Sequence, residues 1–171
     1  MDAAAVLLLA IFIYFLGVYV WLLYLKYRQR ILWDGLYAQL KNRFALLAEL
    51  AYAVRDIYTA EPDALRSVTA SIGAFISSKT PSDAAAAYIR ANAAINSVNE
   101  ALIKYPHVRD AGGCAEILEE MLRVDEKIAF ASRFYDESVL KFNARVKSAP
   151  FALVARMVGI KAKGGVKLGG E

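Results

Sequence analysis

The feature that most constrains this chain is an N-terminal run of 23 residues without a charge, from Ala3 to Leu25. As a helix rising about 1.5 Å per residue, the run is roughly 34 Å long, and the hydrocarbon core of a bilayer is about 30 Å thick. A helix satisfies its own backbone hydrogen bonds in lipid. We therefore expect a transmembrane anchor over residues 1–27. The residues that represent its apolar surface are Val6, Leu9, Ile13, Leu16, Val20 and Trp21.

The charges that flank the run indicate how it is used. A secretory signal peptide has basic residues before a shorter apolar stretch and small residues at a cleavage site after it. Here only Asp2 precedes the run, whereas Lys26, Arg28 and Arg30 follow it. Basic residues favour the cytosolic side of a membrane. The pattern predicts a single-pass protein with its N-terminus outside and its C-terminal domain in the cytosol. A buried core helix is the remaining alternative.

Composition limits the chemistry that we expect. The chain has 21 Lys and Arg against 17 Asp and Glu, an excess too small and dispersed to indicate nucleic-acid binding but compatible with an anionic membrane. The only cysteine, Cys114, leaves no internal disulfide and fits a reducing compartment. The only histidine, His107, lacks partners for a zinc site or a catalytic triad. We expect no cofactor, no metal, no small-molecule substrate and no enzyme activity.

Apolar residues beyond the anchor recur at intervals of three and four, which is typical of amphipathic helices. Long helices are expected at about 28–58, 82–104 and 114–147, with a continuation of the first at about 65–76 and a short amphipathic segment at 151–158. Pro62 should kink or break the first helix, and Ser82 or Asp83 should cap the second. No segment alternates with period two. The predicted fold is all-α: the transmembrane helix followed by an antiparallel bundle of three long helices.

The residues expected on the buried faces define this bundle. They are Leu36, Leu40, Phe44, Leu47, Leu50, Val54 and Ile57; Leu65, Val68, Ile72, Phe75 and Ile76; Tyr88, Ile95, Val98, Leu102 and Ile103; and Ile117, Met121, Val124, Ile128, Ala131, Tyr135, Phe142 and Val146. Charged residues such as Arg43 are expected largely on other faces. The bundle domain is placed at residues 28–160, and paired glycines among lysines predict a flexible basic tail at 161–171.

Four segments together resemble the LemA family. They are Leu36–Arg43, Lys104-Tyr105-Pro106, Arg133–Asn143, and Ala149-Pro150-Phe151 with Ala155. The sequence departs from the family pattern where Asp136 replaces an asparagine, where Phe142 replaces a tyrosine, and at residues 44–50. The resemblance implies a bacterial inner-membrane protein with a cytosolic helical bundle and no known catalysis.

The most unusual polar cluster lies on the last long helix, and we predict it as a candidate interaction surface. Tyr135 and Phe142 are seven residues apart and so face one side. The alternative, which the sequence favours, is a contact between helices in which Arg133 hydrogen-bonds buried polar groups, against the helix that carries Asn42 and Arg43. The cluster consists of Arg133, Tyr135, Asp136, Phe142 and Asn143.

Other reactive residue types have simpler interpretations. Cys114 at a helix start could have a lowered pKa, but a small residue at that position is the favoured interpretation. The loop at residues 110–113 lacks the Lys-Ser/Thr of a phosphate-binding loop. The acids of the last long helix are expected on a solvated face paired with Arg123 and Lys127. These acids are Glu116, Glu119, Glu120, Asp125 and Glu126.

The predicted function is a membrane-anchored, non-catalytic scaffold or adaptor whose cytosolic helices bind another protein or a second copy. The alternative is an oligomeric protein that organises or remodels the membrane at the inner leaflet. The expected partners are membrane lipid and either a homo-oligomer or another membrane protein. Residues 151–158, followed by Lys161, Lys163 and Lys167, could lie on the membrane surface or dock on the bundle, and the sequence favours neither.

Overall fold

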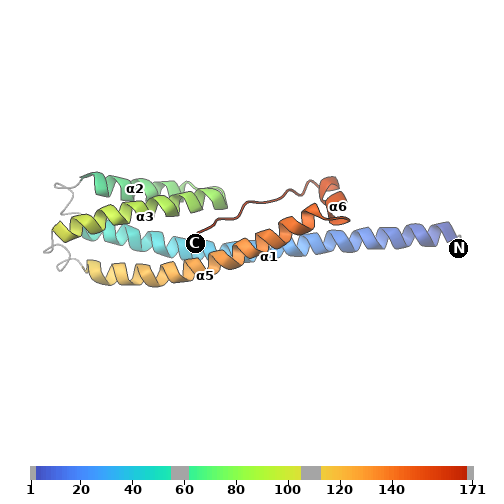
Figure 1. Cartoon of the computed structure of the whole chain (residues 1–171), viewed down its shortest axis with the longest axis horizontal. Helices are drawn as coiled ribbons and strands as arrows, with labels where there is room; N and C mark the ends of the chain where they lie inside the picture. Colours follow the sequence, from blue (N-terminus) through green and yellow to red (C-terminus); the bar gives the residue numbers. More distant parts are fainter. Residues whose placement is uncertain (1–2, 55–61, 105–112, 169–171) are drawn as a thin grey trace. The chain divides into compact units, whose positions relative to one another are not determined.

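The structure, a computed structural model, describes residues 3–54, 62–104 and 113–168 (Figure 1). Within these ranges every regular element is a helix and no strand occurs, which confirms the predicted all-α fold. The helices are α1 (Ala3–Ala53), α2 (Pro62–Ile76), α3 (Pro81–Lys104), α5 (Cys114–Lys147) and α6 (Phe151–Met157). α1 runs from the apolar N-terminal segment into the following amphipathic segment without interruption. α2 begins at Pro62, as a proline in the first turn of a helix allows.

The chain forms two compact units, and α1 and α5 contribute to both. The first unit combines residues 1–33 with 134–165, and the second combines 34–133 with 166–171. The two units are defined by contacts between residues. The anchor, bundle domain and tail predicted from the sequence are defined by position along the chain, and they stay predictions.

In the part of the second unit that the structure describes, four helical segments surround a shared apolar interior. α2 and α3 lie side by side (Figure 1). The ring of Phe44 on α1 stacks on that of Phe75 on α2, with the ring centres 4.1 Å apart. Alanines on the inner face of α3 are buried, including Ala84, Ala87 and Ala91, and such small side chains permit close helix approach. Each large apolar side chain buried here contributes about 1.5–3 kcal/mol to folding.

The predicted buried faces are largely confirmed in this unit, with two exceptions. Ile76 and Ile103 are 77% and 76% exposed. Each directly follows a buried residue of its stripe, Phe75 or Leu102. One residue turns a helix by about 100°, so both isoleucines point away from the interior. Ile57 lies outside the described residues.

The start of α3 also differs from the prediction. Thr80, rather than Ser82 or Asp83, is the capping residue. Its hydroxyl oxygen accepts the Asp83 N–H at 3.2 Å, while the Asp83 carboxylate accepts the Thr80 N–H at 3.0 Å. This reciprocal pair is a capping box, which the Thr-Pro-Ser-Asp sequence permits and which satisfies two backbone donors at once.

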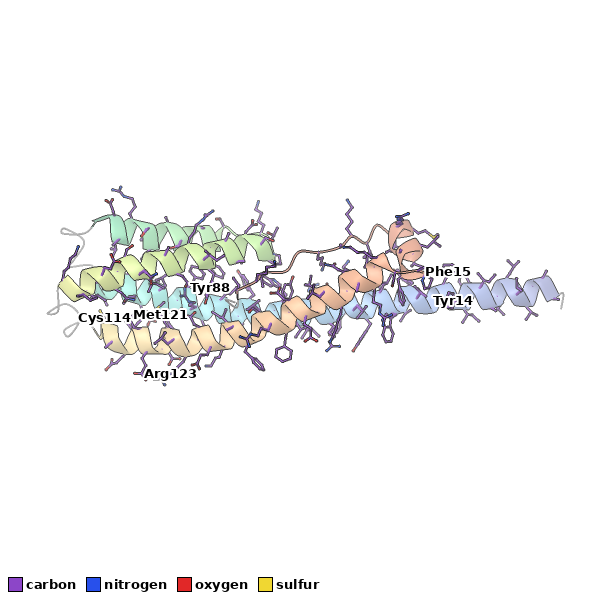
Figure 2. All side chains as sticks on the ribbon, viewed as in Figure 1. Tyr14, Phe15, Tyr88, Cys114, Met121 and Arg123 are labelled. Atoms are coloured by element: carbon purple, nitrogen blue, oxygen red, sulfur yellow. The ribbon has the colours of Figure 1, made fainter. Side chains whose placement is uncertain are left out.

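The first unit joins the N-terminal part of α1 to the end of α5 and to α6. Val18 and Leu22 of α1 form a buried cluster with Val154 and Ala155 of α6. Partly buried hydrophobic residues surround this cluster: Phe15, Tyr19, Val146, Phe151 and Ile160. Figure 2 labels Phe15 beside α6. Farther along α1, the rings of Trp33 and Tyr135 lie 5.5 Å apart. The predicted short helix at 151–158 is therefore present, and it packs against α1.

Candidate functional site

The N-terminal part of α1 presents a broad apolar surface. α1 is the one helix, among the residues that the structure describes, that is long and apolar enough to cross a membrane. Its side chains are exposed on all sides in the first turns, and Leu8 reaches 66%. The residues chosen from the sequence to represent the anchor are all exposed: Val6, Leu9, Ile13, Leu16, Val20 and Trp21. A helix that is apolar all around its circumference requires an apolar environment.

α6 interrupts this apolar surface at one place. Its inner face, with Val154 and Ala155, covers Val18 and Leu22. Its outer face carries Leu153 at 56% and Met157 at 79% exposure. The two positions left open for residues 151–158 were the bundle and the membrane surface, and the observed contact differs from both, because one face of α6 packs on Val18 and Leu22 of the predicted anchor. The same helix keeps a second, exposed apolar face.

The segment after α6 is held on α5 at Lys163. Asn143 of α5 donates from Nδ2 to the Lys163 carbonyl oxygen at 2.7 Å and accepts the Lys163 N–H at 2.9 Å. The Lys163 ammonium lies 5.9 Å from the ring centre of Phe142. Partial burial lowers the pKa of Lys163, and the positive charge of Lys26 lowers it further. The Lys163 backbone is therefore fixed on α5, and the charge of Lys26 acts on its ammonium.

The structure divides the predicted interaction cluster on α5 into different environments. Arg133 is exposed, so the alternative in which it hydrogen-bonds buried polar groups is wrong. Tyr135 and Phe142 are buried at 3% and 1% exposure, because their shared face is the inner face of α5. Asp136 and Asn143 are partly buried along the segment after α6. A role of this cluster in binding a partner stays a prediction.

The buried arginine is Arg43 of α1. Its Nε donates to Oδ1 of Asp125 on α5, and its Nη2 donates to Oδ2 of the same carboxylate at 3.3 Å. Nη2 also lies 2.5 Å from the Asn92 amide oxygen on α3. Tyr88 of α3 donates its hydroxyl to Asp125 Oδ1 at 2.9 Å, and its ring centre is 4.5 Å from the guanidinium carbon. In Figure 2 Tyr88 is labelled on α3.

This polar cluster of Arg43, Tyr88, Asn92 and Asp125 was missed by the sequence reasoning. Arg43 was expected on another face and Asp125 on a solvated one, and both expectations are wrong. Arg43 lies midway along the buried stripe, three residues after Leu40 and four before Leu47, so the spacing carried the signal.

The cluster neutralises the charge of Arg43 inside the second unit. Arg43 is 2% exposed, and its Nη1 finds no hydrogen-bond partner among the described residues. The Asp125 carboxylate offsets its charge, and the tyrosine and asparagine add hydrogen bonds, as a buried ion pair requires. Burial and the neighbouring Asp125 raise the pKa of Tyr88 to about 12, so the phenol stays protonated at neutral pH. The four groups are engaged with one another.

The remaining candidates behave as helix residues. Arg123 pairs with Glu119 at 2.8 Å and Glu120 at 3.6 Å, which confirms a salt-bridged outer face there. Figure 2 labels it on the outer side of α5. Cys114 is fully buried at the start of α5, and burial raises rather than lowers its pKa. His107 and most of the 110–113 loop lie outside the described residues. Within the described ranges, no three metal-ligating side chains converge.

Comparison with known families gives one match. The model of the LemA family matches residues 32–169, which is most of the chain and includes all of the second unit except its last two residues. A comparison with curated proteins finds no match. The match agrees with the helix order and with the motifs on α1 and α5 that resemble this family. The chain therefore belongs to the LemA family.

Proposed function

We propose that the chain is a single-pass inner-membrane protein whose helical units act in the cytosol as a non-catalytic scaffold or adaptor. The observation that carries this proposal is the continuity of α1. The N-terminal turns of α1 are apolar and exposed, and the C-terminal half of the same helix carries buried residues of the second unit. A partner bound to that unit is tethered to the membrane through α1.

The charges around α1 support the proposed orientation. The apolar run ends at Leu25 and is followed by Lys26, Arg28 and Arg30, while Asp2 precedes it. Basic residues are retained on the cytosolic side during insertion. This charge distribution supports an N-terminus outside the cell membrane and helical units in the cytosol.

The state of the reactive groups supports a role without catalysis. The Cys114 thiol is buried and its pKa is raised, which disfavours the nucleophilic thiolate. The charged groups inside the second unit, Arg43 and Asp125, are paired with each other. Such pairing stabilises the fold and leaves these groups poorly placed to bind a substrate.

Labelling with a membrane-impermeant maleimide tests the anchor and its direction. In a Cys114→Ser background, Asp2→Cys should react in intact cells, and Ser77→Cys, which is exposed after α2, should react only after the membrane is broken. The background protein alone is the control. The opposite reactivity would refute the orientation, and release of the chain by alkaline carbonate would refute the anchor.

Crosslinking in native membranes followed by mass spectrometry tests the scaffold role. Recovery of one dominant partner protein supports an adaptor. Recovery of only the chain itself supports the second candidate, an oligomeric membrane-organising protein. That candidate has its own support in exposed apolar side chains on the outer face of α5, where Leu122 and Phe130 are 67% and 66% exposed.

A further inference from the structure

The inference concerns α6, and it rests on the proposed membrane anchor. About 20 consecutive apolar residues are needed to cross a bilayer. The uncharged run extends only from Ala3 to Leu25, bounded by Asp2 and Lys26. Every stretch of about 20 residues within it includes Val18 and Leu22. These are the residues that α6 covers. α6 therefore lies at the depth of the last turns of the membrane span.

The sides of α6 match such a position. Its inner face is occupied by α1, and its outer face exposes Leu153 and Met157, with Val158 directly after it. Arg156 is exposed between these apolar residues. Short helices with an apolar face and basic residues at its margin lie in the boundary between headgroups and acyl chains. Long basic side chains there extend to the phosphates while their stems stay in the apolar layer.

A second observation indicates the charge of the lipid. Lys26 directly follows the apolar run. The two hydrogen bonds with Asn143 hold the Lys163 backbone on α5, and the positive charge of Lys26 acts on the Lys163 ammonium. The nearby acid Glu137 is paired with Lys141 at 2.6 Å and lies close to Arg28. An anionic group between the two ammonium groups relieves their repulsion.

We propose that α6 and the residues after it as far as Lys163 form a second membrane-contacting element, which lies in the inner-leaflet interface and binds an anionic phospholipid headgroup through Lys26 and Lys163. The outer face of α6 is then covered by acyl chains. The bound headgroup links α1 to the segment after α6 at the membrane surface. The anchor thus becomes a structure of two elements with a preferred lipid.

Depth measurements on the full-length chain test the position of α6. In a Cys114→Ser background, Met157→Cys or Leu153→Cys carries an environment-sensitive fluorophore in phosphatidylcholine vesicles that contain phosphatidylglycerol. The matched control is Leu122→Cys, a leucine on α5 in the second unit whose exposure lies between those of Leu153 and Met157. Lipids with quenchers on their acyl chains should quench the fluorophore at 157 and 153 but not at 122.

Lipid selectivity tests the lysine pair. Spin-labelled phosphatidylglycerol should associate with the reconstituted chain more strongly than spin-labelled phosphatidylcholine. Lys163→Gln should reduce that preference about fivefold, the equivalent of about 1 kcal/mol for one lysine near an anionic surface. This variant keeps the backbone groups that Asn143 binds. Lys79→Gln, an exposed lysine before α3, removes the same charge elsewhere and should leave the preference unchanged.

The outcomes separate this inference from the anchor. Equal quenching at 157 and 122 in a chain that resists carbonate extraction overturns the position of α6 and leaves the anchor intact. A fluorophore at 157 that is shielded only at high protein density, without lipid quenching, means that a second copy covers α6, which also overturns the inference. An equal effect of Lys79→Gln and Lys163→Gln overturns the headgroup site. Extraction of the chain by carbonate overturns both proposals.

Discussion

Asn143 and Lys163 are joined by two hydrogen bonds, in which the amide side chain of the asparagine binds both the N–H and the carbonyl oxygen of the lysine backbone. An asparagine side chain can reproduce in this way the pairing that a neighbouring strand would offer. The segment after α6 is thereby held along α5, although it has no helical hydrogen bonds of its own.

Asn143→Ala should release this segment. The substitution removes both hydrogen bonds, and nothing else in the side chain replaces them. Hydrogen exchange of the detergent-solubilised chain should then speed up at the Lys163 amide, while the interior of α5 keeps its protection. Asn96→Ala, which changes an exposed asparagine on α3, serves as the control.

The two glycines after Lys163 give a second test of the same segment. A Cβ at Gly165 would lie 2.5 Å from Asp136 Oδ1, whereas a Cβ at Gly164 meets nothing within 4 Å. Equal exchange in Gly165→Ala and Gly164→Ala would contradict a close contact here.

Removal of one partner of the Arg43–Asp125 pair should strongly destabilise the second unit. Asp125→Asn leaves the Arg43 guanidinium buried without its counter-charge, and such changes cost about 3–5 kcal/mol. Chemical unfolding followed by circular dichroism measures the loss. The control is Arg123→Met, which removes an exposed ion pair on the same helix and should cost less than about 1 kcal/mol. The double variant Arg43→Met/Asp125→Leu removes both charges and should be more stable than Asp125→Asn. If it is no more stable, the uncompensated charge of Arg43 is not the cause of the lost stability.

The capping box of α3 should make stability depend on acid pH. Its hydrogen bonds from Thr80 and Lys79 lower the pKa of Asp83 below its ordinary value. A carboxylate with a lowered pKa in the folded state stabilises the fold above its unfolded pKa of about 3.9, and this contribution is lost as pH falls through the folded value. Thr80→Ala should cost about 1 kcal/mol at neutral pH, because the cap hydroxyl is lost. The difference between the parent chain and Thr80→Ala should shrink below about pH 4. A difference that stays constant down to pH 2 would show that the carboxylate plays no part.

The Cys114 thiol should be unreactive in the folded chain. It is fully buried, and burial raises its pKa, so both access and thiolate content are low. Modification by a maleimide at neutral pH should be slow under native conditions and rapid in denaturant. A cysteine placed at the exposed position Ser77 is the reference for an accessible thiol. Native modification of Cys114 as fast as that of the reference thiol would place it at the surface.

The sequence by itself determined which segments are helical and which faces they bury. Apolar spacing along one helix is a local property, so the stripe that contains Leu40, Phe44 and Leu47 could be identified without any partner. The same holds for the uncharged run, because length and charge alone decide whether a helix is apolar enough to cross a bilayer. Local spacing failed where a stripe ended, as at Ile76 and Ile103, since one further residue turns the helix away from its neighbour.

The tertiary structure alone decided which polar groups meet. Arg43 and Asp125 are 82 residues apart, and their pairing depends on the register of α1 against α5, which no spacing within one helix contains. The sequence therefore directed attention to Arg133, whose side chain is exposed, instead of Arg43, which lies in the interior. The place of α6 is decided in the same way. Its amphipathic pattern is local, but the residues of α1 that it covers follow from the path of the chain through Pro150, and those residues lie within the uncharged run.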